Sequence, residues 1–184
     1  MIVKKLTLMA MLTAIALVVF VIEAQIPLPV PVPGAKLGLA NSVTLFALFY
    51  MFPPSQEAGS RYPQPDSKRR PALTVSNVLM ILICRIILGA VFTGRVISFI
   101  YSVVGGLLSF LTMVAARKVV TEKQVWVCGA LGAVFHNVGQ IIAALFITGT
   151  PSIIAYLPVL IIIGIVTGVI TGFAAQFTIA RLSK

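Results

Sequence analysis

Acidic residues are scarce in this chain, with 4 Asp and Glu against 14 Lys and Arg among 184 residues. Binding of Mg²⁺ together with a diphosphate needs carboxylates near each other, and an ion pump normally carries acidic residues in mid-membrane. Three of the four, Glu57, Asp66 and Glu122, fall in polar segments between hydrophobic runs. The sequence therefore argues against a magnesium-dependent diphosphate enzyme and against a self-driven pump.

Other catalytic signatures are also missing. The one histidine, His136, has no carboxylate near it in sequence, and Cys84 and Cys128 belong to no CxxC motif. No Walker A motif and no Cys/His metal-ligand spacing occurs. We therefore expect neither an enzyme nor a bound cofactor or metal, and any energy for transport would come from partner subunits.

Charged residues of both signs make up only 10% of the chain, whereas 59% is hydrophobic and the mean hydropathy is +1.09. Soluble domains carry about 25% charged residues, and about 20 apolar residues in helical form cross a bilayer core. The sequence predicts an all-α, polytopic membrane protein with a single membrane domain over residues 1–184. Six transmembrane helices are expected at about 6–24, 37–52, 72–91, 96–116, 124–147 and 153–180.

The basic residues predict the orientation. With the N-terminus inside, eleven Lys and Arg fall on the cytoplasmic side, Lys36 and Arg95 fall outside, and Arg85 lies within a span. This positive-inside bias places both termini in the cytoplasm. The net charge of +10 is thus a topology signal, and we expect no nucleic-acid partner.

Two connections have unusual composition. Residues 25–34 read QIPLPVPVPG, with proline at every second position, which favours an extended, semi-rigid path on the outer face. This strap could cover a vestibule as a lid, or could be a plain connector. The polar, basic segment Pro53–Pro71 is expected to be a cytoplasmic loop beside lipid headgroups.

Small residues recur at helical spacing in three spans. The sixth span contains Gly164, Gly168 and Gly172, a pattern that favours close packing of helices within the bundle. The fourth span has similar spacing among small residues at Ser98, Ser102, Gly105, Gly106 and Ser109. In the first span, Ala10 and Ala14 form a comparable face.

Polar side chains within the membrane are costly and need a partner, water or a function. In this chain they gather in the outer half of the predicted bilayer, which suggests a cavity open to the outside and closed towards the cytoplasm. The three cationic side chains there, Lys36, Arg85 and Arg95, outnumber the one carboxylate, Glu23. An anionic or electron-rich ligand is therefore expected. The alternative is a set of internal struts, such as Arg85 with Glu23, and His136 with Asn41 or a backbone carbonyl. The candidate ligand-binding residues are Glu23, Lys36, Asn41, Arg85, Arg95, His136, Asn137 and Gln140.

Four stretches of the chain resemble a bacterial membrane-protein family. They are IPLPVPVPGAKLGLANSVTLFAL, RIILGAVFTGRVISFIYSVVGGLLS, GAVFHNVGQ and YLPVLIIIGIVTGVITG. The chain is similar to the family labelled heptaprenyl diphosphate synthase component I, also called the Gx transporter family. That family is grouped with the S components of energy-coupling-factor (ECF) transporters.

The resemblance implies a six-helix S-component-like bundle in the bacterial cytoplasmic membrane. It would capture a small ligand from outside, either an anion or a molecule like a cofactor or an isoprenoid precursor. It also implies partners, namely a transmembrane coupling subunit and two cytoplasmic ATPases, and it makes Ala10 and Ala14 the expected docking face. The loop Pro53–Pro71 departs from the short connection usual in S components. The alternatives are a non-catalytic accessory subunit of a prenyl diphosphate synthase, or a subunit of a quinone or flavin redox assembly.

Overall fold

The computed structural model describes residues 2–26, 36–50, 73–94 and 96–182, and these ranges contain helices and no strand. Residues 27–34 of the predicted strap 25–34, and the predicted loop of residues 53–71, lie outside the described residues. The helices are α1 (Ile2–Glu23), α2 (Asn41–Tyr50), α3 (Val75–Thr93), α4 (Val96–Ala116), α5 (Val125–Thr148) and α6 (Leu157–Leu182). Two short 3₁₀ helices, η2 (Glu122–Gln124) and η3 (Pro151–Tyr156), precede α5 and α6.

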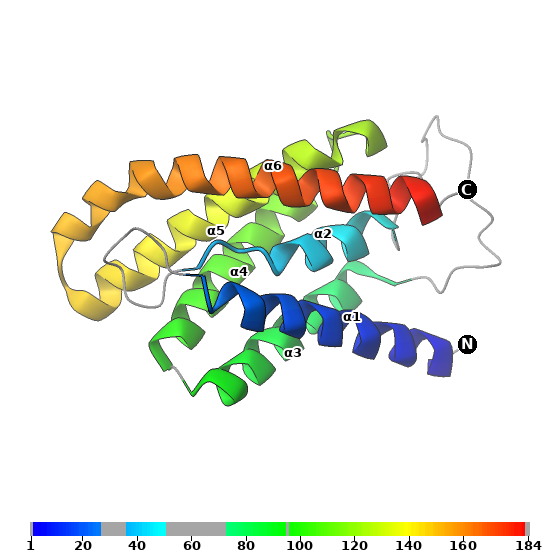
Figure 1. Ribbon diagram of the computed structural model, residues 1–184, viewed down its shortest axis with the longest axis horizontal. Helices are drawn as coiled ribbons and strands as arrows, with labels where there is room; N and C mark the ends of the chain where they lie inside the picture. Colours follow the sequence, from blue (N-terminus) through cyan, green and yellow to red (C-terminus); the bar gives the residue numbers. More distant parts are fainter. Residues whose placement is uncertain (1, 27–35, 51–72, 95, 183–184) are drawn as a thin grey trace.

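The helices form one elongated bundle in which successive helices run in opposite directions (Figure 1). The N-terminus and the C-terminus therefore lie at the same end of the bundle. Helix α5 packs along both α4 and α6, whereas α1 packs mainly against α3. Helix α2 lies between these groups and contacts α6, α5, α1, α3 and α4.

Five segments are long and apolar enough to cross a membrane. They are α1, α3, α4, α5 and the combined segment Pro151–Leu182. Helix α2 has only 10 described residues, which corresponds to about 15 Å against a hydrocarbon core of about 30 Å. The all-helical membrane fold is confirmed, while a sixth span at α2 remains a prediction because residues 51–72 are not described.

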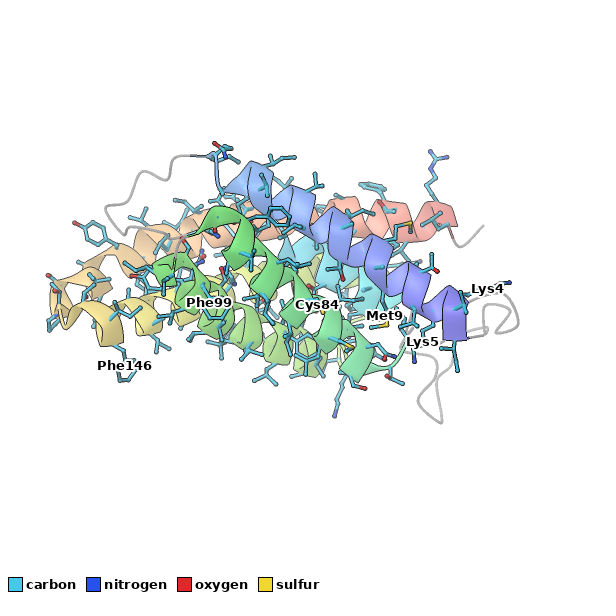
Figure 2. All side chains as sticks on the ribbon, turned by 90° about the horizontal axis from the view of Figure 1, so that it is seen from below. Lys4, Lys5, Met9, Cys84, Phe99 and Phe146 are labelled. Carbon is cyan, nitrogen blue, oxygen red and sulfur yellow. The ribbon has the colours of Figure 1, made fainter. Side chains whose placement is uncertain are left out.

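The outer surface of the bundle is strongly apolar, as expected for a protein surrounded by lipid. Phe92, Phe146 and Phe177 are 70%, 87% and 66% exposed. Figure 2 shows Lys4 at one end of the bundle and Phe146 at the other. Such an apolar surface would aggregate in water, so we describe the chain as a multi-pass membrane protein.

Glycine residues determine where α3 and α5 end. Gly94 and Gly149 both adopt the left-handed conformation with φ of 62°, and their amides bond to the carbonyls of Ala90 and Leu145. This glycine cap terminates a helix because residues with a Cβ adopt that conformation only at a cost. The α3–α4 and α5–α6 connections lie at the same end of the bundle, opposite the termini (Figure 1).

Glycine also allows α4, α5 and α6 to approach closely. A Cβ atom added to Gly139 of α5 would lie 2.7 Å from the Cα of Gly105 on α4. A Cβ atom added to Gly168 of α6 would lie 2.7 Å from the carbonyl oxygen of Gly129 on α5. The predicted role of the small-residue faces in packing within the bundle is confirmed for α4 and α6.

Candidate functional site

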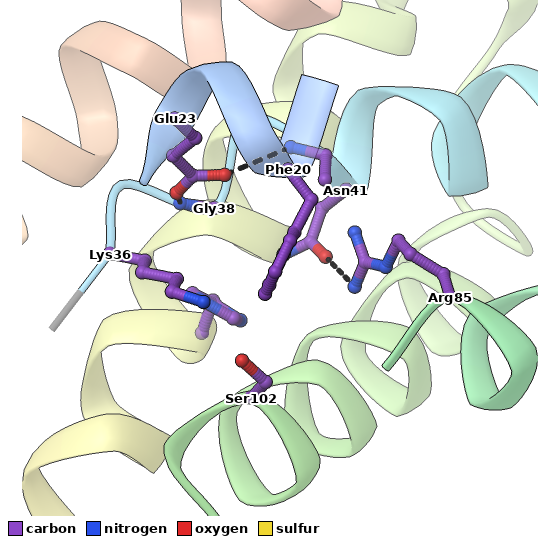
Figure 3. A pocket seen from close by; sticks show the side chains of 9 residues that line it. Phe20, Glu23, Lys36, Gly38, Asn41, Arg85 and Ser102 are labelled. Atoms are coloured by element: carbon purple, nitrogen blue, oxygen red, sulfur yellow. Dashed lines mark hydrogen bonds between the residues drawn. The ribbon is translucent and has the colours of Figure 1, made fainter. Parts of the chain in front are cut away.

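Most of the candidate polar residues converge on one small cavity. Its walls come from α1, the segment 36–40, α2, α3, α4 and α5 (Figure 3). The space open to the centre of a water molecule is about 10 Å³, which corresponds to roughly one water. In this conformation a larger ligand would have to displace side chains. The lining residues are Phe20, Glu23, Lys36, Gly38, Ala40, Asn41, Arg85, Ser102 and His136.

Glu23, the last residue of α1, holds the segment that leads into α2. Its carboxylate accepts hydrogen bonds from the backbone amides of Gly38 and of Ala40, the latter at 3.3 Å. Gly38 has a φ of +79°, and a Cβ atom there would lie 2.9 Å from Cδ2 of His136. Glycine is therefore required at this position for both its conformation and its lack of a side chain.

Arg85 lies near the middle of α3 and is only 3% exposed. Its Nη2 donates a hydrogen bond of 3.1 Å to the side-chain oxygen of Asn41, whose Nδ2 donates to Ser109 at 3.2 Å. Its Nε has no hydrogen-bond partner among the described residues. The expected pairing with Glu23 is not direct, since Glu23 bonds to backbone amides. A buried guanidinium thus contacts a neutral amide rather than a carboxylate.

Lys36 extends into the cavity from the segment 36–40. Its Nζ lies 3.4 Å from the centroid of the Phe20 ring, in a cation–π arrangement. The backbone amide of Lys36 donates to Oε1 of Gln140 at 3.1 Å. Both the backbone and the side chain of Lys36 are therefore held by the wall of the cavity.

His136 acts as a neutral support for this arrangement. Its Nε2 lies 2.8 Å from Nε2 of Gln140. Since Oε1 of Gln140 accepts the Lys36 amide, Nε2 of Gln140 is the donor and Nε2 of His136 the acceptor. Its Nδ1 lies against Gly105, where an added Cβ atom would be 3.0 Å away. The side of the imidazole ring that faces Gly38 is therefore carbon rather than nitrogen. His136 forms its side-chain hydrogen bond with Gln140, and not with Asn41 as suggested from the sequence.

Two of the predicted residues that the structure describes, Asn137 and Gln140, do not line this cavity. Asn137 is fully buried and its Nδ2 donates to the carbonyl of Leu160 at 2.6 Å, so it lies between α5 and α6. It is not among the residues that line the cavity. Arg95 lies outside the described residues.

Four lining residues were not predicted as site residues: Phe20, Gly38, Ala40 and Ser102. Gly38 and Ala40 contribute backbone amides, and such a role leaves no signal in side-chain type. Phe20 is one apolar residue among many in α1. Ser102 belongs to the small-residue face of α4, which we interpreted as packing.

No group of three or more His, Cys, Asp or Glu residues that could hold a metal ion occurs in the described part of the chain. The donors around the cavity are instead amides, hydroxyls and cations, with Glu23 already bonded to two backbone amides. Such a set suits recognition of a polar or anionic organic molecule.

Comparison with protein families gives a match to heptaprenyl diphosphate synthase component I over residues 12–56 and 71–178. The chain belongs to this family. In this member of the heptaprenyl diphosphate synthase component I family, every described candidate residue of the site lies within the matched ranges. Residues 57–70, inside the predicted cytoplasmic loop, lie outside the match. No curated protein and no solved structure matches the chain.

Proposed function

We propose that this protein is the substrate-binding membrane subunit, or S component, of an ECF-type importer, and that it captures a small anionic ligand from outside. The observation that supports this most is the convergence of Arg85, Lys36 and Asn41 from separate elements on one small cavity. A purely structural strut would normally pair a buried guanidinium with a carboxylate. Here Nη2 of Arg85 bonds to the neutral amide of Asn41, and its Nε has no partner among the described residues, which in our proposal leaves Nε for an anionic ligand.

The orientation of the bundle supports capture from outside. The cavity lies where α1 ends and α2 begins, towards the end of the bundle away from the termini. The basic residues at the terminal end match the cytoplasmic side under the positive-inside rule. In our proposal six spans cross the bacterial cytoplasmic membrane, both termini are cytoplasmic, and the cavity faces outwards. The described basic residues of the terminal end are Lys4, Lys5, Arg117, Lys118, Lys123 and Arg181.

Helix α1 provides the docking surface in this proposal. Its buried residues, including Leu12 and Ala16, face the bundle, whereas Ala10 and Ala14 are exposed. Two small residues four positions apart lie on one helix face and allow another helix to approach closely. A coupling subunit would dock there, and ATPases bound to that subunit would supply the energy that this chain cannot.

Native mass spectrometry of the gently solubilised protein, expressed in its own host, tests the proposal. We expect co-purification of a transmembrane coupling subunit with two ATPases, and a bound small anion that is lost in the Arg85→Gln variant. Two results together would contradict the S-component role. The purified complex would contain no ATPases, and cells that lack this gene would not regain uptake of the bound small anion when the gene is restored.

The family description supports a second candidate, a non-catalytic membrane subunit that accompanies a prenyl diphosphate synthase. In this role, as in a subunit of a quinone or flavin redox assembly, the chain would not itself be an enzyme. The same experiment separates the candidates, since a soluble prenyl synthase or a redox protein would then replace the ATPases in the purified complex.

A further inference from the structure

The charges around the cavity can be counted, and the count limits the charge of the ligand. Lys36 and Arg85 each contribute one positive charge, and Glu23 contributes one negative charge. All three side chains are at least nine-tenths buried, at 8%, 3% and 3% exposed. The three residues together give the cavity a net charge of +1.

His136 adds no charge to this count. Its Nε2 accepts the hydrogen bond from Gln140, because Oε1 of Gln140 is occupied by the backbone amide of Lys36. A protonated imidazole carries a hydrogen on both ring nitrogens and could not accept that bond. The hydrogen-bond chain from Lys36 through Gln140 therefore keeps the ring neutral.

The rest of the outer end contributes little charge. In the sequence, residues 24–35, between α1 and the segment 36–40, and residues 149–156, between α5 and α6, contain no Asp, Glu, Lys or Arg. Arg95 is the one further charged residue that the sequence predicts at the outer mouth. Even with Arg95 included, the sum reaches only +2.

A ligand that enters a site surrounded by low-dielectric protein and lipid must leave little uncompensated charge, because a buried unpaired charge is strongly disfavoured. A ligand with one negative charge neutralises the cavity, whereas a diphosphate with about three leaves an excess of negative charge. Glu23 cannot relieve that excess by withdrawing, since its carboxylate holds the amides of Gly38 and Ala40.

We infer that the ligand of the proposed site is a monoanion, with a single carboxylate that binds Arg85, and that prenyl diphosphates are excluded. This inference rests on the proposed function of the cavity in capturing an anion. The unpaired Nε of Arg85 and its planar guanidinium suit the two oxygens of a carboxylate. The carboxylate would lie between Arg85 and Lys36, and Lys36 would leave the face of Phe20 to reach it.

A series of probes with the same five-carbon group tests the charge preference. The purified full-length protein in detergent is titrated with 4-methylpentanoate, 3-methylbutyl phosphate, 3-methylbutyl diphosphate and the neutral 3-methylbutan-1-ol, in buffer with a metal chelator. The increase of the thermal midpoint with probe concentration gives an apparent Kd. We expect the carboxylate to bind at least about ten-fold more tightly than the diphosphate, and more tightly than the alcohol.

Two variants of Arg85 test whether the carboxylate of the probe binds at this residue. Arg85→Gln should reduce carboxylate binding to the level of the alcohol. Arg85→Lys keeps the charge but loses the planar fork, so it should retain the order of the probes with weaker carboxylate binding, which also provides a folded control. Equal or tighter binding of the diphosphate would overturn the monoanion inference and leave anion capture intact. If no acid binds more tightly than the alcohol, anion capture itself is wrong.

Discussion

Gln140 accepts a hydrogen bond of 3.1 Å from the backbone amide of Lys36, a residue 104 positions earlier in the chain. This contact attaches the segment 36–40, which forms part of the cavity wall, to α5 in the centre of the bundle. Because Gln140 also binds His136, one amide side chain positions both a backbone segment and an imidazole ring. The geometry of the cavity therefore depends on a residue that does not itself line it.

Replacement of Gln140 by leucine should loosen this segment. The amide of Lys36 and Nε2 of His136 would both lose their partner, and one unsatisfied buried polar group costs about 1–3 kcal/mol. We expect a lower thermal midpoint in detergent and weaker binding of any anionic probe. Gln176→Leu, on α6, removes an amide whose Oε1 has no partner among the described residues, and serves as the matched control. Equal stability of Gln140→Leu and wild type would contradict the role of this contact.

Asn41→Asp should prevent anions from binding to Arg85, because it adds a competing carboxylate to the cavity. The new carboxylate would pair with Arg85, which already bonds to Oδ1 of Asn41, and Ser109 could donate its hydroxyl where it now accepts. The cavity would lose its net positive charge, so anionic probes should bind at least about ten-fold more weakly while the thermal midpoint stays the same or rises. Asn41→Leu, which leaves Arg85 without that partner, should lower the midpoint. Unchanged anion binding in Asn41→Asp would show that Arg85 does not contact the ligand.

Two adjacent glycines in α4 should respond differently to alanine. A Cβ atom at Gly105 would lie 2.7 Å from the backbone oxygen of His136, which cannot move without α5. At Gly106 the nearest atom is Cδ1 of Ile86 at 3.1 Å, the end of a flexible side chain. Gly105→Ala should therefore destabilise the protein by about 1–3 kcal/mol and Gly106→Ala by much less, as measured by denaturation in mixed micelles. The reverse order would mean that α4 and α5 are less closely packed than described.

Bulky residues on the exposed face of α1 should block docking without affecting the cavity. Replacement of both Ala10 and Ala14 by leucine should abolish energised uptake and co-purification of the coupling subunit, while probe binding to the isolated protein remains unchanged. Met11→Leu, on the same helix and 53% exposed, is the control and should be neutral. Full uptake by the double variant would rule out this face as the docking surface.

The sequence predicted the elements of the fold more completely than the elements of the site. The apolar runs gave six helices close to their expected positions, because a hydrophobic segment in lipid must satisfy its backbone hydrogen bonds internally. Helix α2 begins at Asn41 rather than near Leu37, since Gly38 adopts a positive φ and Glu23 binds the amides of Gly38 and Ala40. That interruption depends on a contact with another helix, which no local pattern reveals.

Among the candidate residues, Arg85, Asn41, Lys36, Glu23 and His136 line one cavity. They could be named from sequence because polar side chains are rare and costly in a membrane. Asn137 satisfies the same criterion yet bonds to Leu160 between α5 and α6. The direction in which a polar side chain faces depends on how its helix is rotated against its neighbours.

By itself, the sequence determined that this chain is a helical membrane protein without clustered carboxylates, because hydropathy and charge act through composition and short-range order alone. Only the tertiary structure decided that Glu23 holds a backbone segment, that the His136 ring is neutral, and that Arg85 contacts an amide instead of a carboxylate. Those outcomes depend on hydrogen bonds between residues far apart in the chain, and such bonds form only where helix packing brings the partners within about 3 Å.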